Sequence, residues 1–257
     1  MKKLITPGLV FIFIFFWTKG WAGQEGSSDS LSLRFRFGVE TEILKRSLWW
    51  PKEEKTTSLQ AYLALFRLET EFLKGLNVAL LGGYSSSKFE SLVFRQLPIS
   101  IDFDVGGLSG SLFGLEISQV FPLNLIAVGG RARFLTYNGQ EKKWAIPDLA
   151  VEGELKSQPN WRMITIGPFI GHNGYENLFP YLAIQYQHFW GQFTLREIIE
   201  NLAGTETKDI KTKGKIALSL GANFWLTSKI ALCGEATLIP YKGGQDWGLK
   251  FNGIFSF

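Results

Sequence analysis

Two histidines are the side chains of this sequence best suited to act as a general base near neutral pH. His172 precedes Asn173 and Gly174, a pair typical of turns, and no Ser or Asp follows at a spacing typical of a nucleophilic triad. His188 shares an alternating register with Tyr186 and Trp190, which favours an interfacial aromatic band over catalysis. We therefore expect no enzymatic activity.

Cofactor and metal chemistry is also missing from the pattern. Cys233 is the only cysteine, which excludes an internal disulfide, a thiolate zinc site and a Cys-x-x-Cys pair. No phosphate-binding loop or dinucleotide fingerprint is present, so no cofactor is predicted. The dense basic stretch consists of Lys208, Lys211, Lys213 and Lys215. It predicts a solvated loop, or alternatively a contact with lipid phosphates at an outer rim.

Charged residues recur instead at every second position of otherwise apolar segments, which predicts one charged face and one apolar face on a series of β-strands. The predicted charged face comprises Arg34, Arg36, Arg67, Glu69, Glu71, Glu116, Arg131, Arg133, Glu152 and Glu154, with Glu40, Lys215, Glu235 and Lys250 in the same set. Positive and negative residues are interleaved. The first hairpin is expected to bring Arg34 and Arg36 near Glu69, and a middle hairpin to bring Arg131 and Arg133 near Glu152.

The elements that must position these charges are antiparallel strands joined alternately by short turns and longer polar loops. Short turns are predicted near residues 75, 123, 159, 190 and 228, and one long strand over 99–121. This rhythm gives twelve strands. Residues 195–202 could instead be a short amphipathic helix within a loop, and ten strands remain if residues 192–199 are loop. Residues 200–214 are predicted to be a charged loop.

The N-terminus has the pattern of a secretory signal. Lys2 and Lys3 precede the apolar run 9–17 and a small-x-small site that ends at Ala22, which predicts cleavage after Ala22. Residues 1–22 are thus a predicted signal peptide and residues 23–257 a single domain. The formal charge is +4 from 27 Lys and Arg against 23 Asp and Glu, and removing the three signal lysines leaves 24 against 23. A nearly neutral mature chain argues against nucleic-acid binding.

The last twelve residues alternate most clearly. Trp247, Leu249, Phe251, Phe255 and Phe257 occupy one face, and the chain ends on Phe257 with nothing to cover that face. Twelve residues suffice for a tilted membrane-spanning strand, which needs about 9–11. This ending, with Phe251, Phe255 and Phe257 as an assembly signature, resembles bacterial outer-membrane β-barrel proteins. The resemblance implies an all-β, transmembrane, antiparallel up-and-down barrel in the outer membrane, surrounded by lipid and lipopolysaccharide and assembled by the barrel-assembly machinery.

Lipid does not accept charge cheaply, so the charged face must line the barrel lumen. Its interleaved signs fit two hypotheses. The charges form a closed, paired network inside a structural or surface-presenting barrel, because an orphan buried charge is costly. Alternatively they line the constriction of a narrow channel for small polar solutes. An outer-membrane lipid hydrolase or protease with a site at the extracellular rim is the enzymatic alternative.

Overall fold

The computed structural model describes residues 34–50, 56–94, 97, 101–145 and 153–257, and all the regular elements in this part of the chain are strands. Their bounds are β1 (Arg34–Trp49), β2 (Thr56–Leu73), β3 (Leu76–Phe94), β4 (Ile101–Leu123), β5 (Ile126–Gly139), β6 (Lys142–Ala145), β7 (Gly153–His172), β8 (Leu178–Ile199), β9 (Leu202–Thr212), β10 (Ile216–Trp225), β11 (Ile230–Tyr241) and β12 (Gly244–Ser256). The described residues contain no helix long and apolar enough to cross a membrane.

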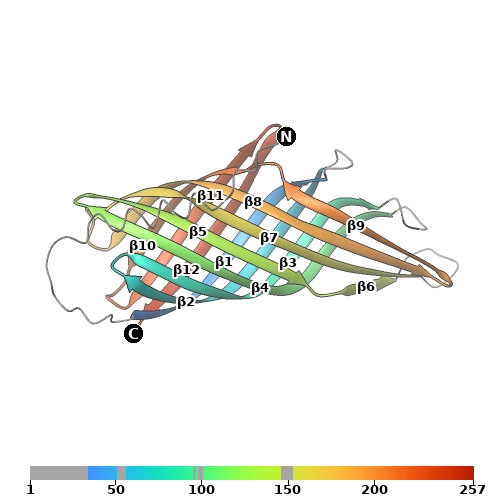
Figure 1. Ribbon diagram of the computed structural model, residues 1–257, viewed down its shortest axis with the longest axis horizontal. Coiled ribbons are helices and arrows are strands. Elements are labelled where there is room, and N and C mark those ends of the chain that lie inside the picture. Colours follow the sequence, from blue (N-terminus) through green and yellow to red (C-terminus); the bar gives the residue numbers. More distant parts are fainter. Residues whose placement is uncertain (1–33, 51–55, 95–96, 98–100, 146–152) are drawn as a thin grey trace, which may run out of the picture. The chain divides into compact units, whose positions relative to one another are not determined.

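Ten of these strands close a ring of hydrogen bonds in the order β1, β2, β3, β4, β5, β7, β8, β10, β11 and β12, and β12 pairs back onto β1. All pairings are antiparallel. β6 pairs with β7, whereas β9 pairs with β8 along its length and with β1 only at Leu48 and Trp49. Figure 1 shows β6 and β9 at the end away from the C-terminus. The predicted antiparallel barrel is confirmed, with twelve strands and a ten-stranded ring.

The outer face of the ring carries a belt of exposed apolar side chains, because alternate residues of each strand point outward. Phe66 is 61% exposed, Leu80 59% and Leu182 59%, values that a water-facing sheet rarely shows for large apolar side chains. Lipid is the solvent that such a belt fits, and the molecule is a transmembrane β-barrel.

The wall is taller than this belt requires. β4 has 23 residues and β8 has 22, about twice the ~9–11 that cross a bilayer. Towards the end that carries β6 and β9 the outward-facing residues become polar, for example Lys88 and Thr207. The strands therefore continue beyond the lipid belt.

At the other end the strands are joined by short connections. Gly75 (φ 79°) turns β2 into β3, and Asn124 (φ 57°) turns β4 into β5. Both ends of the ring lie here, since the Phe257 N–H bonds to the Phe35 carbonyl at 3.5 Å. Short turns at the end where the first strand begins and the last strand ends are typical of the periplasmic end of such barrels.

The interior changes character along the barrel axis. The inward-facing positions within the belt are largely polar and charged, whereas those beyond it form an apolar core. Trp161 stacks on Tyr137 at 5.1 Å and lies 5.1 Å from Phe189, while Phe193 lies 5.2 Å from Phe89. The inward-facing side chains thus fill the half of the barrel that carries β6 and β9 with an apolar core like that of a soluble sheet protein.

Several sequence-based boundaries need correction. The turns predicted near 159 and 190 are wrong, because β7 and β8 run unbroken through both positions. Pro159 is tolerated because the partner of β7 changes there from β5, whose last pair is Asn138–Asn160, to β6, whose first is Lys142–Ser157. Residues 192–199 are strand, as first predicted, but belong to β8 rather than forming a strand of their own.

The stretch predicted as a charged loop over 200–214 is mostly strand β9, paired in register with the upper half of β8. Its Thr residues alternate with charged ones, a pattern that suits a strand whose outer face meets water. The long strand predicted over 99–121 is confirmed as β4, and the Pro122–Asn124 turn is confirmed as well. The predicted signal peptide (1–22) and Glu152 lie outside the described residues.

Candidate functional site

The candidate site is the layer of charged side chains that fills the barrel at the level of the lipid belt. Strand alternation points all of them inward, and the register between neighbouring strands sets opposite charges side by side: Arg36 lies opposite Glu69, Glu116 opposite Arg133, and Glu235 opposite Lys250. The layer consists of Arg36, Glu40, Glu42, Arg67, Glu69, Glu116, Arg131, Arg133, Glu235 and Lys250. Five cations thus face five carboxylates, so the layer has no net charge.

Arg67 and Arg133 form the centre of this charged layer. Arg67 bonds to Glu69 at 2.6 Å and to Glu116 at 2.8 Å, and lies 3.6 Å from Glu40. Arg133 contacts Glu40 at 2.6 Å and is 3.9 Å from Glu116. The two arginines therefore share two carboxylates. The contacts Arg133–Glu40, between β5 and β1, and Arg67–Glu116, between β2 and β4, join strands that are not neighbours in the ring, so these two contacts cross part of the lumen.

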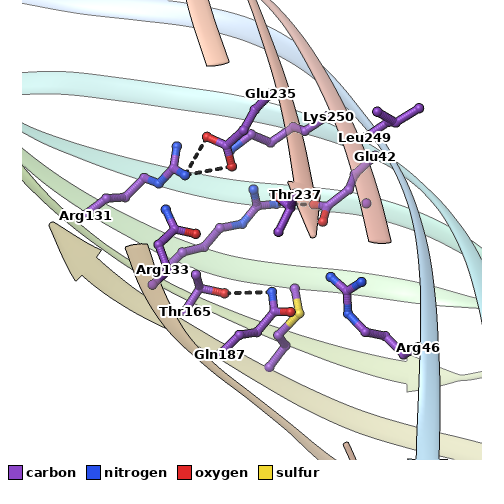
Figure 2. A pocket seen from close by; sticks show the side chains of 13 residues that line it. Glu42, Arg46, Arg131, Arg133, Thr165, Gln187, Glu235, Thr237, Leu249 and Lys250 are labelled. Atoms are coloured by element: carbon purple, nitrogen blue, oxygen red, sulfur yellow. Dashed lines mark hydrogen bonds and ion pairs between the residues drawn. The ribbon is translucent and has the colours of Figure 1, made fainter. Parts of the chain in front are cut away.

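A second group joins β5 to β11. Arg131 donates to both carboxylate oxygens of Glu235, at 2.6 and 2.8 Å, drawn as two dashed lines in Figure 2. β7, β8 and β10 lie between β5 and β11 in the ring, so these bonds cross the lumen. The Tyr181 hydroxyl donates to the same carboxylate at 2.6 Å, and the Lys250 ammonium lies 3.5 Å away. Glu235 thus accepts hydrogen bonds from two side chains and forms an ion pair with a third, so its buried carboxylate is satisfied.

A small cavity borders this second group. Its volume is about 30 Å³, and its lining includes Arg131, Thr165, Gln187 and Glu235. The Gln187 amide donates to the Thr165 hydroxyl at 3.2 Å, seen as the lower dashed line in Figure 2. A polar space of this size suits about one or two ordered waters rather than a solute.

Above the cavity a fully buried arginine marks the point where β1 changes partner. Arg46 donates to the Trp247 carbonyl at 2.7 Å, and Asp246 accepts the Ser47 N–H at 2.8 Å. The carbonyl of the same Ser47 accepts the N–H of Lys213, the residue that follows β9. Side chains of Arg46 and Asp246 thus satisfy backbone groups that the transition from β12 to β9 leaves unpaired.

Beyond this junction the apolar core closes over the polar layer. Tyr137 is fully buried there, and its hydroxyl donates to the Leu108 carbonyl at 3.3 Å. Burial raises the pKa of Tyr137 to about 12. The described residues therefore fill the interior with two stacked layers, one charge-balanced and one aromatic.

No protein-family model and no curated protein matches the chain. Among solved structures, the outer membrane protease OmpT from Escherichia coli matches with a TM-score of 0.44 at 10% identity, covering 90% of this chain and 100% of that one. An outer membrane channel from Pseudomonas putida F1 matches with a TM-score of 0.42 at 12% identity, covering 91% and 100%. A major outer membrane protein from Thermus thermophilus matches with a TM-score of 0.39 at 12% identity, covering 87% and 99%.

The chain is similar to bacterial outer-membrane barrels. At this identity the similarity concerns the fold alone and transfers no residue role.

The structure brings together most, but not all, of the residues predicted to face the lumen. The predicted contact of Arg36 with Glu69 is present at 3.0 Å. Arg34 begins β1 opposite Glu71. Glu71 lies apart from the charged layer and accepts the Gly75 N–H at 2.9 Å in the turn between β2 and β3.

Glu154 lies at the opposite end of the barrel. It stands 3.5 Å from both Lys143 and Lys156 in half-exposed surface pairs. The predicted register that set Arg131 and Arg133 opposite Glu152 is wrong, because these arginines lie opposite Gly167 and Thr165. The cause is the misplaced turn at 159, which shortened β7. Lys215, also predicted to face the lumen, is exposed beside the start of β10.

Glu42 and Arg46 were missed. The predicted charged set stops at Glu40 in the first strand, although Glu42, Leu44, Arg46 and Leu48 continue the same alternation up to Trp49. This unbroken alternation could have predicted that Glu42 and Arg46 face inward. The same inward face of β1 continues into the apolar core at Leu44 and Leu48.

The histidines lie away from the charged layer. His172 ends β7 at the short-turn end of the barrel, opposite Ile126, and its Nδ1 accepts the Gly174 N–H at 3.0 Å. His188 stacks on Trp190 at 5.2 Å and lies 6.4 Å from Tyr186, in the outward register predicted for it. Cys233 is a half-buried free thiol on β11. Within the described part of the chain, no group of three or more His, Cys, Asp or Glu could hold a metal ion.

Proposed function

We propose that this protein is a closed outer-membrane barrel that holds a rigid β-structure above the membrane surface, a structural or surface-presenting role rather than transport or catalysis. The observation that carries the proposal is the filling of the interior. Ion pairs such as Arg131–Glu235 span the lumen, and the cavity beside them measures about 30 Å³. Above them lies the aromatic core of Trp161 and Phe193.

Placement in the outer membrane is part of the same proposal. The apolar belt, the signal-like N-terminus and the terminal Phe257 support it. Partners that follow from this placement are lipid, lipopolysaccharide and the barrel-assembly machinery. A second candidate function is a narrow channel for small polar solutes, which the polar, water-sized cavity within the charged layer favours.

Single-channel recording separates the two functions. Wild-type protein in a planar bilayer is expected to give no resolvable conductance, and the variant Arg131→Gln/Arg133→Gln is expected to lose stability without gaining current. A conducting wild type, with a reversal potential that shifts towards cation selectivity in the double variant, would instead establish the channel. Insertion is verified independently by the shift in gel mobility between heated and unheated samples.

A further inference from the structure

The outer face of the barrel is hollowed on one side into an apolar groove. The groove measures about 1030 Å³, at the top of the ~300–1,000 Å³ range of small-molecule sites. β5, β7, β8, β10, β11 and β12 all contribute to it, and Leu182, Ile184, Leu218, Leu220, Leu238 and Leu249 are among its lining side chains. It is a depression in the lipid belt itself, since these six are 37% to 61% exposed.

The register accounts for the shape of the groove. Leu182 on β8 lies opposite Leu220 on β10, and Leu220 lies opposite Ala236 on β11. The outward side chains across these three strands therefore change from leucine to the much smaller alanine. Ala236 provides the shallow floor. Gly248 and Thr237 border both this groove and the inner cavity, so only the backbone sheet separates the two.

A row of cations lies just above the groove on the same face. Trp190 is flanked by Arg162 on β7 and by Lys211 on β9, and both are exposed. Lys215 is exposed as well, and its carbonyl accepts the Gln187 N–H beside His188. We call Arg162, Lys211 and Lys215 the cation row. Asp209, an exposed carboxylate two residues before Lys211 on β9, accepts a hydrogen bond from Gln192 at 3.0 Å.

The level of the cation row identifies the chemistry it meets. Tyr186, His188 and Trp190 form an aromatic band, and aromatic bands mark the lipid headgroup region. From Ile184 in the groove to His188 in this band is four residues, or about 13 Å along the strand. An occupant that fills both regions must therefore have apolar chains below and negative charge at headgroup level.

We propose that the groove and the cation row together bind a phosphorylated, multiply acylated glycolipid, the chemistry of lipopolysaccharide, with acyl chains against Leu182, Leu218 and Leu220 and phosphates at the cation row. This inference rests on the proposed outer-membrane placement. Another copy of the chain fits less well, because a two-fold interface through this face would oppose the same cations.

The test uses the full mature chain, refolded in lipid-free detergent and titrated with defined lipids under native mass spectrometry. The probes are bisphosphorylated lipid A, its dephosphorylated form and phosphatidylglycerol. Lys211→Gln/Lys215→Gln removes two phosphate contacts, and its matched control is Lys74→Gln/Lys229→Gln, two exposed lysines at the opposite end. Ala236→Phe fills the groove floor, and Ala64→Phe adds the same bulk at an exposed outward position on β2.

Wild type is expected to bind bisphosphorylated lipid A more tightly than either other probe. The Lys211/Lys215 variant should lose about 10- to 100-fold of that affinity and bind the two lipid A forms alike. Ala236→Phe should weaken both lipid A forms, whereas the two control variants should bind as wild type does.

Equal binding of phosphatidylglycerol, or equal effects of Ala236→Phe and Ala64→Phe, would overturn the proposal. A barrel that inserts into bilayers but shows no preference for lipid A would overturn this inference alone and leave the proposed function standing. Heat-modifiable gel mobility of each variant shows that any loss of binding is not a loss of fold.

Discussion

At the scale of single residues, the charged layer depends on the pairing of each group with its partner. Arg131 and Glu235 are joined by two short bonds, and both side chains are largely buried, at 13% and 6% exposed. Removing one partner of a buried pair typically costs about 3–5 kcal/mol, because the other charge remains desolvated. An exposed pair contributes about 0–1 kcal/mol.

We therefore predict that Arg131→Glu lowers the free energy of unfolding by about 3–5 kcal/mol, since two carboxylates would then face each other. The swap Arg131→Glu/Glu235→Arg should recover part of the loss, measured by urea titration of the refolded barrel. Lys88→Glu, in the half-exposed pair with Glu90, is the control and should cost about 1 kcal/mol or less. Additive losses in the swap would contradict the pairing.

Tyr137 gives a prediction on pH. Its pKa in the fold is about 12 against an ordinary value of 10.0, because burial favours the neutral phenol. The folded state holds this proton more tightly than the unfolded chain, so the stabilisation is fully present below pH 10 and is lost as the pH rises towards 12. The free energy of unfolding should fall between about pH 10 and 12, and should fall less steeply in Tyr137→Phe. Parallel curves for the two proteins would show that Tyr137 does not titrate in this window.

At the scale of elements, close contacts between strands fix how the aromatic core packs. A Cβ at Gly191 on β8 would lie 2.3 Å from the Asn160 carbonyl oxygen and 2.7 Å from the Trp161 Cβ on β7. Gly110 on β4 makes the same kind of room for Tyr137. Glycines next to aromatic side chains thus let neighbouring strands approach while the rings cover the glycine positions.

Gly191→Ala is accordingly expected to destabilise the barrel by about 1–3 kcal/mol, because the wall must shift to admit the methyl group. The matched substitution is Gly82→Ala, where the added Cβ meets nothing within 4 Å, and its effect should stay within about 0.5 kcal/mol. The measurement is the midpoint temperature at which unheated gel mobility is lost. Equal midpoints for the two variants would mean that the β7–β8 contact does not limit stability.

The sequence predicted this fold well where alternation was unbroken and less well where a turn residue stands inside a strand. Residue type alone indicated the inward charges, since lipid rejects them. Pro159 looked like a turn because its tolerance depends on the exchange of β5 for β6 beside β7, a tertiary fact. The pairing of Arg131 with Glu235 could not be predicted from the sequence for a similar reason. β5 and β11 are not neighbours, and only closure of the ring brings them together.

The apolar core above the membrane was also beyond the sequence analysis. A strand with apolar residues inside and polar residues outside has the same alternation as one with the faces reversed, so the pattern does not reveal where the barrel leaves the lipid. In β2 the change occurs between inward Leu65 and inward Arg67. Below it the charges face in and the apolar residues face lipid, whereas above it the apolar residues face in.

At the scale of the whole molecule, ring closure and assembly make different demands on the last residue. Phe257 is 88% exposed, and its backbone N–H bonds to the Phe35 carbonyl. Its ring therefore adds little to the stability of the closed barrel. We propose that recognition during assembly is instead the role of this residue, in keeping with the proposed placement in the outer membrane.

These two roles predict opposite results in two experiments on Phe257→Lys. Refolded in detergent or lipid, the variant should match the wild-type midpoint in urea, because the aromatic ring packs against little in the fold. Expressed in a bacterium with an outer membrane, it should instead accumulate as a protease-sensitive species in the periplasm. Phe255→Lys, which changes a 45% exposed residue inside the apolar belt, is the comparison and should weaken both refolding and assembly. Normal assembly of Phe257→Lys would remove the assembly role, whereas a large loss in urea stability would show that the terminal ring supports the β1–β12 closure itself.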